Sequence, residues 1–76
     1  MAAIELKRYT ASIMVDFGTA RETARDSSVI AASDDIDAHQ KANEWLRHSG
    51  KAEDGDHLVV VLDGRVVKDI PLRVVH

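Results

Sequence analysis

The segment that most constrains this chain runs from His57 to Ile70, HLVVVLDGRVVKDI. Two runs rich in β-branched residues flank Asp63-Gly64, and this pattern is one of the strongest short-range signals for a β-hairpin. Both runs are apolar at consecutive positions instead of alternate ones. Because successive strand side chains point to opposite faces, both faces of this hairpin carry apolar side chains. Few residues remain outside the hairpin, so the rest of the chain has little surface with which to cover both apolar faces.

The length of 76 residues predicts a single small α+β domain, residues 1–76. A chain of this size buries only about 60% of its unfolded surface. Its stability therefore depends on a cross-link such as a disulfide or a metal, on a well-packed core or on self-association. The absence of cysteine excludes disulfides and thiolate metal sites and fits a reducing compartment. The sequence shows no secretory signal and no apolar run near the ~20 residues that span a bilayer. We therefore expect a cytoplasmic protein without a membrane partner.

The N-terminal part predicts a first strand over about 4–16. Apolar and polar residues alternate from Tyr9 to Phe17, which is the period of a half-buried strand. Ile4 and Leu6 lie in the opposite phase and predict a bulge or bend near residues 7–8. A turn at Gly18-Thr19 follows.

The segment 20–31 is ambiguous between strand and helix. Its alanines recur at helical spacing, and the ARETAR stretch has fair helix propensity. The following Ser27-Ser28-Val29-Ile30 is poor helix sequence, and a strand here would pair back on the first strand. We favour a polar edge strand, with a helix as the alternative.

The clearest helix covers about 34–48. Ser33 or Asp34 can act as the N-cap, and Gly50 is a natural stop. Acidic residues in the first turn and basic residues in the last turn stabilise the helix, because each interacts favourably with the nearer end of the helix dipole. One arc of this helix suits packing against a sheet; it contains Ile36, Ala38, Ala42, Trp45 and Leu46.

The predicted order is therefore β-β-α-β-β, an α+β fold in which a four-stranded, mostly antiparallel sheet carries one helix on one face. Pro71 has no amide proton and marks an edge, a bulge or the end of pairing. The Leu72–Val75 segment is too apolar for a disordered tail. It extends the last strand, covers the second sheet face or pairs with another chain, and the sequence leaves these alternatives open.

A two-residue turn at Asp63-Gly64 sets the hairpin pairing. It places Leu62 opposite Arg65, Val61 opposite Val66, Val60 opposite Val67 and Val59 opposite Lys68. One face then carries Leu58, Val60, Leu62 and Val67, and the other carries Val59, Val61, Val66 and Ile70. One helix covers only one face, and each aliphatic side chain left in water forgoes about 1.5–3 kcal/mol relative to burial.

The uncovered face predicts self-association, because contiguous exposed apolar patches usually mark binding surfaces and homodimers are the commonest oligomers. The candidate interface is Leu58, Val60, Leu62 and Val67, with Val59, Val61, Val66 and Ile70 as the alternate set. The helix takes whichever set is not at the interface. The competing interpretation is a monomer in which long side chains and the C-terminal segment cover this face.

His39 is the candidate ligand-binding or pH-sensing residue. At helical spacing it falls inside the apolar arc, and a half-buried imidazole titrates near neutral pH. The alternative is a purely structural role, in which the ring packs at the boundary of the core and a ring nitrogen contacts water or a backbone carbonyl.

No motif identifies a catalytic, metal or cofactor site. Glu44 and His48 at i,i+4 supply only two of the three or four ligands that zinc needs. The acidic loop at 53–57 lacks the spacing of a calcium loop. Ser27-Ser28 has no nucleophile-elbow context, and the glycines are isolated at turns. We expect no metal, no cofactor and no enzymatic activity.

Charge argues against nucleic acid as a partner. Ten basic and thirteen acidic residues give a net charge of −3, and the basic residues are dispersed. Three aromatic residues are too few for a base-stacking platform. The leading functional hypothesis is a non-enzymatic protein-interaction or regulatory module that self-associates as a homodimer. The alternative is a small-molecule or ion-binding module with a site near His39.

Overall fold

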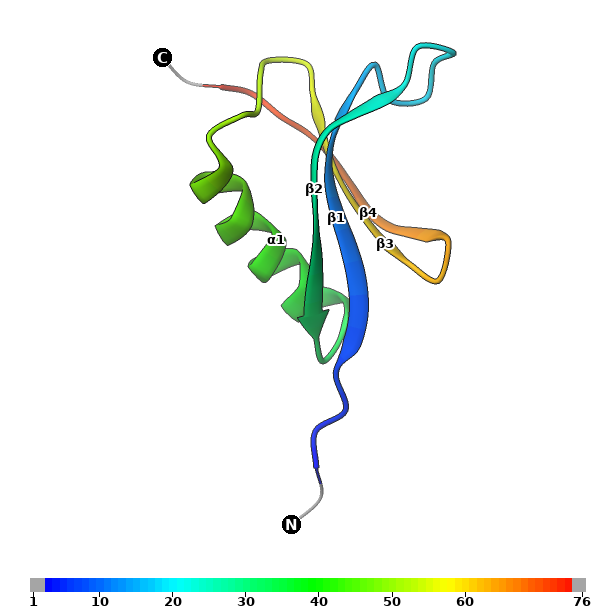
Figure 1. Cartoon of the computed structure of the whole chain (residues 1–76), viewed down its shortest axis with the longest axis vertical. Helices are drawn as coiled ribbons and strands as arrows, with labels where there is room; N and C mark the ends of the chain where they lie inside the picture. Colours follow the sequence, from blue (N-terminus) through cyan, green and yellow to red (C-terminus); the bar gives the residue numbers. More distant parts are fainter. Residues whose placement is uncertain (1–2, 75–76) are drawn as a thin grey trace.

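The computed structural model describes residues 3–74 and contains five elements. They are β1 (Lys7–Val15), β2 (Thr23–Ala32), α1 (Asp35–Ser49), β3 (His57–Leu62) and β4 (Arg65–Pro71). The strands form one antiparallel sheet in the order β2-β1-β3-β4, and α1 lies along one face (Figure 1). The predicted α+β class and β-β-α-β-β order are confirmed.

The helix has the limits that its capping residues predict. The Asp34 side chain accepts a hydrogen bond from the Asp37 amide at 2.8 Å, which satisfies one of the free amides of the first turn. Gly50 stops the helix in the left-handed conformation at φ 64°, where a side chain would be strained.

The ambiguous segment is a strand from Thr23 onward, so the helix alternative is wrong. β2 pairs with β1 from Lys7↔Ala32 to Val15↔Thr23. The irregularity in this pair lies between Ile13 and Met14, and not near residues 7–8, where β1 only begins. The opposite-phase residues Ile4 and Leu6 precede the strand, which explains why their phase does not bend it.

The core lies between α1 and the centre of the sheet. Tyr9 and Ala11 of β1 and Leu58 and Val60 of β3 are fully buried, and they meet the two small helix residues of the predicted arc. Those residues, Ala38 and Ala42, leave room for the helix to lie close to the sheet. Partly buried side chains complete the margin of the core: Trp45, Leu46, Leu62, Val67, Ile70 and Leu72.

The β3–β4 hairpin turns at Asp63-Gly64, where φ is 51° and 77°. The pairs Leu62↔Arg65 and Val61↔Val66 are as predicted, but a register shift follows between Val60 and Val61. Val60 therefore pairs with Lys68, and Val59 with Asp69, so the predicted pairs Val60–Val67 and Val59–Lys68 are wrong. The physical reason is a β-bulge, in which one extra residue of β4 opposes β3.

The bulge also moves Ile70 to the other face. It lies opposite Leu58 and packs on the helix-side core, instead of sharing a face with Val59 and Val61. A one-residue shift exchanges the faces of every later side chain, because strand side chains alternate.

The C-terminal segment follows the loop that precedes β3. Leu72 donates its amide to the Asp56 carbonyl at 2.8 Å and accepts from the Gly55 amide at 3.3 Å. The Leu72 side chain packs on the helix-side core, so it does not cover the second sheet face. Val75, the end of the predicted apolar tail, lies outside the described residues.

Candidate functional site

The structure places the first interface candidates beneath the helix. Leu58 and Val60 are fully buried in the core, and Leu62 and Val67 pack at its margin. This is therefore the set that α1 covers. Any interface on the sheet must use the opposite face, to which Val59, Val61 and Val66 of the alternate set belong.

That opposite face carries a row of cross-strand partners that contains three valines and one threonine. Val29, Thr10, Val61 and Val66 are successive cross-strand partners on β2, β1, β3 and β4, and we call them the valine row. At 4.7–4.9 Å between strands, the row crosses the whole sheet over about 14 Å. The two end valines are well exposed, Val29 at 67% and Val66 at 53%, and Val61 between them is half-buried.

Polar residues border the valine row on both sides. On one side, Ser27, Ser12, Val59 and Asp69 form the next row of partners, and the two serine hydroxyls lie 2.9 Å apart. Val59 is only 3% exposed within this row, so it adds little to the accessible surface. On the other side, Ala31 pairs with Arg8. The accessible apolar surface of this face is thus a narrow strip.

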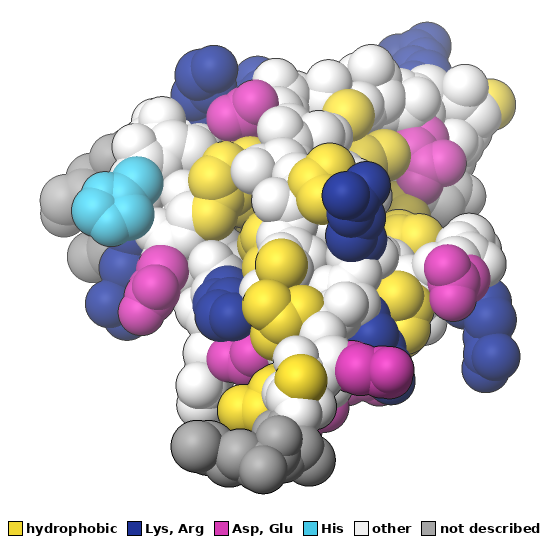
Figure 2. Space-filling view, turned by 60° about the horizontal axis from the view of Figure 1, so that its bottom comes forward, with side chains coloured by type: hydrophobic (Ala, Val, Ile, Leu, Met, Phe, Trp, Pro, Cys, Tyr) yellow, Lys and Arg dark blue, Asp and Glu magenta, His cyan; other side chains and the backbone are white. Residues whose placement is uncertain are grey.

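Further apolar side chains are exposed near the N-terminal end of the molecule. Ile4, Leu6 and Ile36 are all exposed, and Lys7 and Ile36 border one surface hollow of about 290 Å³. Figure 2, in which this end comes forward, shows hydrophobic patches that alternate with basic and acidic side chains. The apolar side chains at this end are therefore interspersed with charged ones, whereas the valine row carries no charge.

An imidazole–carboxylate pair lies on the same sheet face as the valine row. His57 Nδ1 is 2.7 Å from Asp69 Oδ1, and the ring of Phe17 packs beside the His57 ring at 5.4 Å between centroids. Sequence reasoning does not pair His57 with Asp69, because their approach depends on the bulge in β4. Within residues 3–74, no three His, Asp or Glu side chains form a group that could hold a metal ion.

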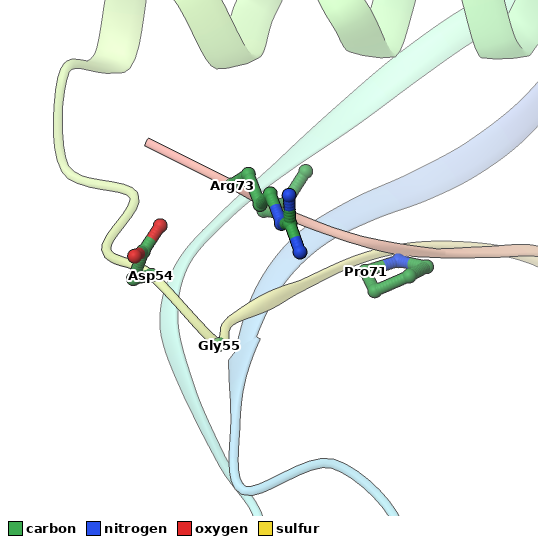
Figure 3. Close-up of a pocket in the computed structure, with 5 residues that line it drawn as sticks. Asp54, Gly55, Pro71 and Arg73 are labelled. Carbon is green, nitrogen blue, oxygen red and sulfur yellow. The ribbon is translucent and has the colours of Figure 1, made fainter. Parts of the chain in front are cut away.

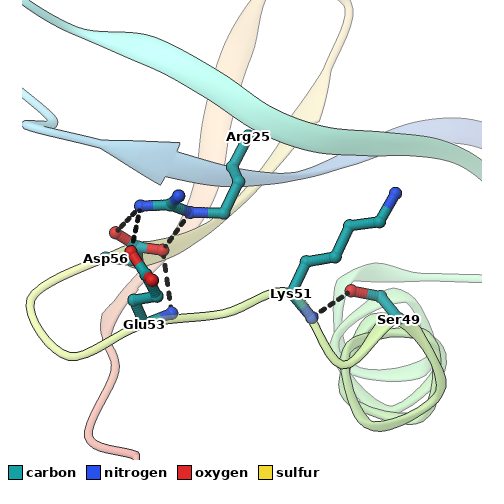
Figure 4. Close-up of polar contacts among 5 residues, drawn as sticks. All are labelled: Arg25, Ser49, Lys51, Glu53 and Asp56. Carbon is teal, nitrogen blue, oxygen red and sulfur yellow. Dashed lines mark hydrogen bonds and ion pairs between the residues drawn. The ribbon is translucent and has the colours of Figure 1, made fainter.

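Asp56 is the buried charged residue among residues 3–74. Its side chain accepts from Arg25 Nε at 2.8 Å, from Arg25 Nη2 at 3.2 Å and from the Glu53 amide at 3.0 Å, while Glu53 Oε2 lies 3.0 Å from Arg25 (Figure 4). The hydrogen bonds from Arg25 hold the pKa of Asp56 below its ordinary value, against the effect of burial. This cluster ties β2 to the loop before β3, and both carboxylate oxygens of Asp56 accept hydrogen bonds within it.

Tyr9 forms a second buried polar contact. Its hydroxyl donates to Asp35 Oδ1 at 2.8 Å, joining the central strand to the first turn of α1. Burial, with the nearby Asp35 carboxylate, raises the pKa of Tyr9 to about 12. The contact orients the helix on the sheet and leaves the hydroxyl protonated at neutral pH.

His39 is half-buried on α1, and its Nε2 lies 3.3 Å from Asn43 Nδ2. Its side chain does not border three surface hollows that lie among the described residues. The largest of these, about 690 Å³, lies between the loop before β3 and the C-terminal segment (Figure 3). Asp54 and Arg73 border it from those two segments, and Asp54 also accepts from the Val74 amide at 2.6 Å.

Comparisons with protein-family models, with curated proteins and with solved structures find no match to this chain. In the part of the chain that the structure describes, α1 is too short and too polar to cross a membrane. The valine row is therefore the candidate functional surface, identified by its own geometry.

Proposed function

We propose that this protein is a non-enzymatic, cytoplasmic interaction module that self-associates as a homodimer through the valine row. The observation that supports this proposal is the exposure of two end valines, 67% and 53%, in one row across all strands. Apolar side chains gathered on one face lose an unfavourable contact with water when a second apolar face covers them.

A second copy suits this face because the row carries no charge. In a two-fold dimer the same patch contacts itself, so a charged centre would repel its copy. Arg8 lies on one side of the row and Asp69 on the other. A two-fold axis along the row brings the Arg8 side of each copy over the Asp69 side of its partner. Arg8 then lies over β1 of the partner, two strands from Asp69, so the two copies do not oppose like charges at these borders.

The size of the molecule limits the strength of this association. A standard interface buries about 800 Å² per partner, which is roughly a seventh of the 5541 Å² surface of this chain. The narrow valine row supplies only part of that area, so the polar rows beside it must join the contact. We therefore expect a weak dimer, in which the row is the dry centre and the serines form part of a wet rim.

Sedimentation equilibrium of the unmodified protein at two concentrations tests the proposal, with a dimer mass expected at the higher one. Val29→Lys and Val66→Lys place a charge at either end of the row and should shift the mass to one chain. Ile36→Lys is the matched control, because Ile36 is 69% exposed but lies on α1. A mass of one chain at every concentration would refute the dimer, and equal effects of all three substitutions would refute the assignment to this face.

A further inference from the structure

The free edge of β2 carries contacts that the proposed function does not use. β2 has β1 on one side only, so its other edge presents backbone groups to solvent. Such edges readily pair with a strand of another chain. Residues 27–32, SSVIAA, contain no charge, glycine or proline and include two β-branched residues, so this stretch is suited to strand addition.

Two side chains occupy backbone groups on this edge. Lys41 reaches from α1 and donates from Nζ to the Ala31 carbonyl at 2.8 Å, and the Asp26 carboxylate accepts from the Ser27 amide at 3.0 Å. Backbone groups of alternate residues in an antiparallel strand point away from its neighbour. These two contacts therefore identify Ser27, Val29 and Ala31 as the residues that point outward from the sheet.

The occupied groups are the ones that a second copy would need. If two β2 edges paired antiparallel about a two-fold axis at Val29, Ser27 of each copy would lie opposite Ala31 of the other. The Ser27 amide would then donate to the partner's Ala31 carbonyl. In the structure that donor is held by Asp26 and that acceptor by Lys41.

The Lys41 contact is itself held in place. Asp37, one turn earlier on α1, lies 3.2 Å from Lys41 Nζ, and the same Asp37 oxygen accepts from the Ser33 amide at 3.0 Å. The ammonium is thus fixed between a helix carboxylate and a strand carbonyl. The other edge of the sheet is also unsuited to pairing, because β4 has three charged residues, a bulge and a terminal proline.

We propose that Lys41, with Asp26, closes the free edge of β2 and so prevents a second copy from extending the sheet through a β2–β2 contact. Self-association is then confined to the sheet face, which keeps it finite instead of allowing a growing sheet. This inference is independent of the homodimer proposed above, which we call the face dimer. The closed edge would prevent β2–β2 pairing of a monomer just as it would of a dimer.

The test is carried out in the Val66→Lys background, where face association is removed. Lys41→Met keeps most of the aliphatic side chain and removes the ammonium. Arg47→Met is the charge-matched control, because Arg47 is an exposed residue of the same helix. Sedimentation velocity should give Lys41→Met about twice the mass of its parent, while Arg47→Met and Lys41→Arg stay at the parent mass.

Amide hydrogen exchange locates any new contact. In Lys41→Met, exchange at Val29 and Ala31 should slow as concentration rises, because those amides become paired. Asp26→Ala, which frees the Ser27 amide, is a second variant that should show the same effect and keeps the test available if Lys41→Met does not fold.

Two results would overturn the proposal that Lys41 and Asp26 close the β2 edge. One is a folded Lys41→Met or Asp26→Ala variant that keeps the parent mass and exchange rates at all concentrations. The other is concentration-dependent slowing of exchange at Val29 and Ala31 in the Val66→Lys parent itself, since that would mean that the edge already pairs with Lys41 in place. A monomeric unmodified protein would refute only the face dimer.

Discussion

The Arg25 guanidinium and the Asp56 carboxylate, 31 positions apart in the chain, meet through hydrogen bonds of 2.8 and 3.2 Å. Asp56 is 3% exposed, whereas the Arg25 side chain is 30% exposed and reaches the surface. A buried carboxylate is stable only where donors replace its water, so the loop before β3 depends on a residue of β2.

We expect Asp56→Asn to lower the free energy of unfolding by about 1–3 kcal/mol at neutral pH, so this variant should unfold at a lower denaturant concentration than the unmodified protein. Asp54→Asn, on the same loop, removes the same charge but keeps an oxygen for the Val74 amide and should have little effect. Urea unfolding followed by far-UV circular dichroism measures both. Equal losses in the two variants would contradict a specific role for Asp56.

The same pair predicts how stability depends on pH. The folded pKa of Asp56 lies below its ordinary value of 3.8, so the carboxylate contributes stability above that value. This contribution is lost as the pH falls through the folded pKa. The difference in unfolding free energy between the unmodified protein and Asp56→Asn should thus be constant at neutral pH and shrink below about pH 4. A difference that grows on acidification would contradict the assignment.

Tyr9 is the only tyrosine in the chain, so absorbance at alkaline pH reports its ionisation directly. We expect half-ionisation near pH 12, because burial and the bond to Asp35 disfavour the phenolate. Since the folded pKa is raised, this contribution to stability is complete below about pH 10 and is lost as the pH rises toward 12. Asp35→Asn should lower the midpoint, and a midpoint of 10 in the folded, unmodified protein would show that the hydroxyl is open to water.

Leu58 tests the location of the core. Leu58→Ala removes a fully buried β3 side chain of the helix-side core and should destabilise the fold by about 2–5 kcal/mol. Ile4→Ala removes a side chain of the same size that is 79% exposed and should change stability by about 0.5 kcal/mol or less. Equilibrium urea unfolding of both variants at low protein concentration checks this, and a small effect at Leu58 would contradict the helix-covered face.

The N-cap of α1 gives a local test. Asp34→Ala removes the acceptor for the Asp37 amide and should cost about 1 kcal/mol, whereas Asp34→Ser keeps an acceptor and most of the stability. Thermal unfolding by circular dichroism compares the two variants. Equal melting temperatures for alanine and serine would show that the cap contributes nothing.

Local rules predict much of this fold. Asp34 and Gly50 define the helix because capping depends on residues within one turn, and Asp63-Gly64 defines the last hairpin because its turn needs positive φ. The existence of a second apolar face also follows from the sequence, because strand side chains alternate. The segment 20–31 needed the structure, since its strand forms only against β1.

The candidate surface shows the limit of such rules. Sequence periodicity predicts two alternative sets of aliphatic residues on the hairpin. It cannot say which set the helix covers, because that depends on packing between elements far apart in the chain. The bulge in β4 then moved Ile70 to the core face, an outcome that no pairwise turn rule contains. Val29 joined the row only through the register of β2 on β1.

By itself, the sequence determined the first strand, the helix limits, the hairpin turn and the surplus of apolar side chains, because neighbouring residues encode all of these. Only the tertiary structure decided which valines remain exposed, which carboxylate Arg25 neutralises and which carbonyl Lys41 occupies. Those outcomes depend on strand register and on the position of the helix, which arise when the whole chain packs together.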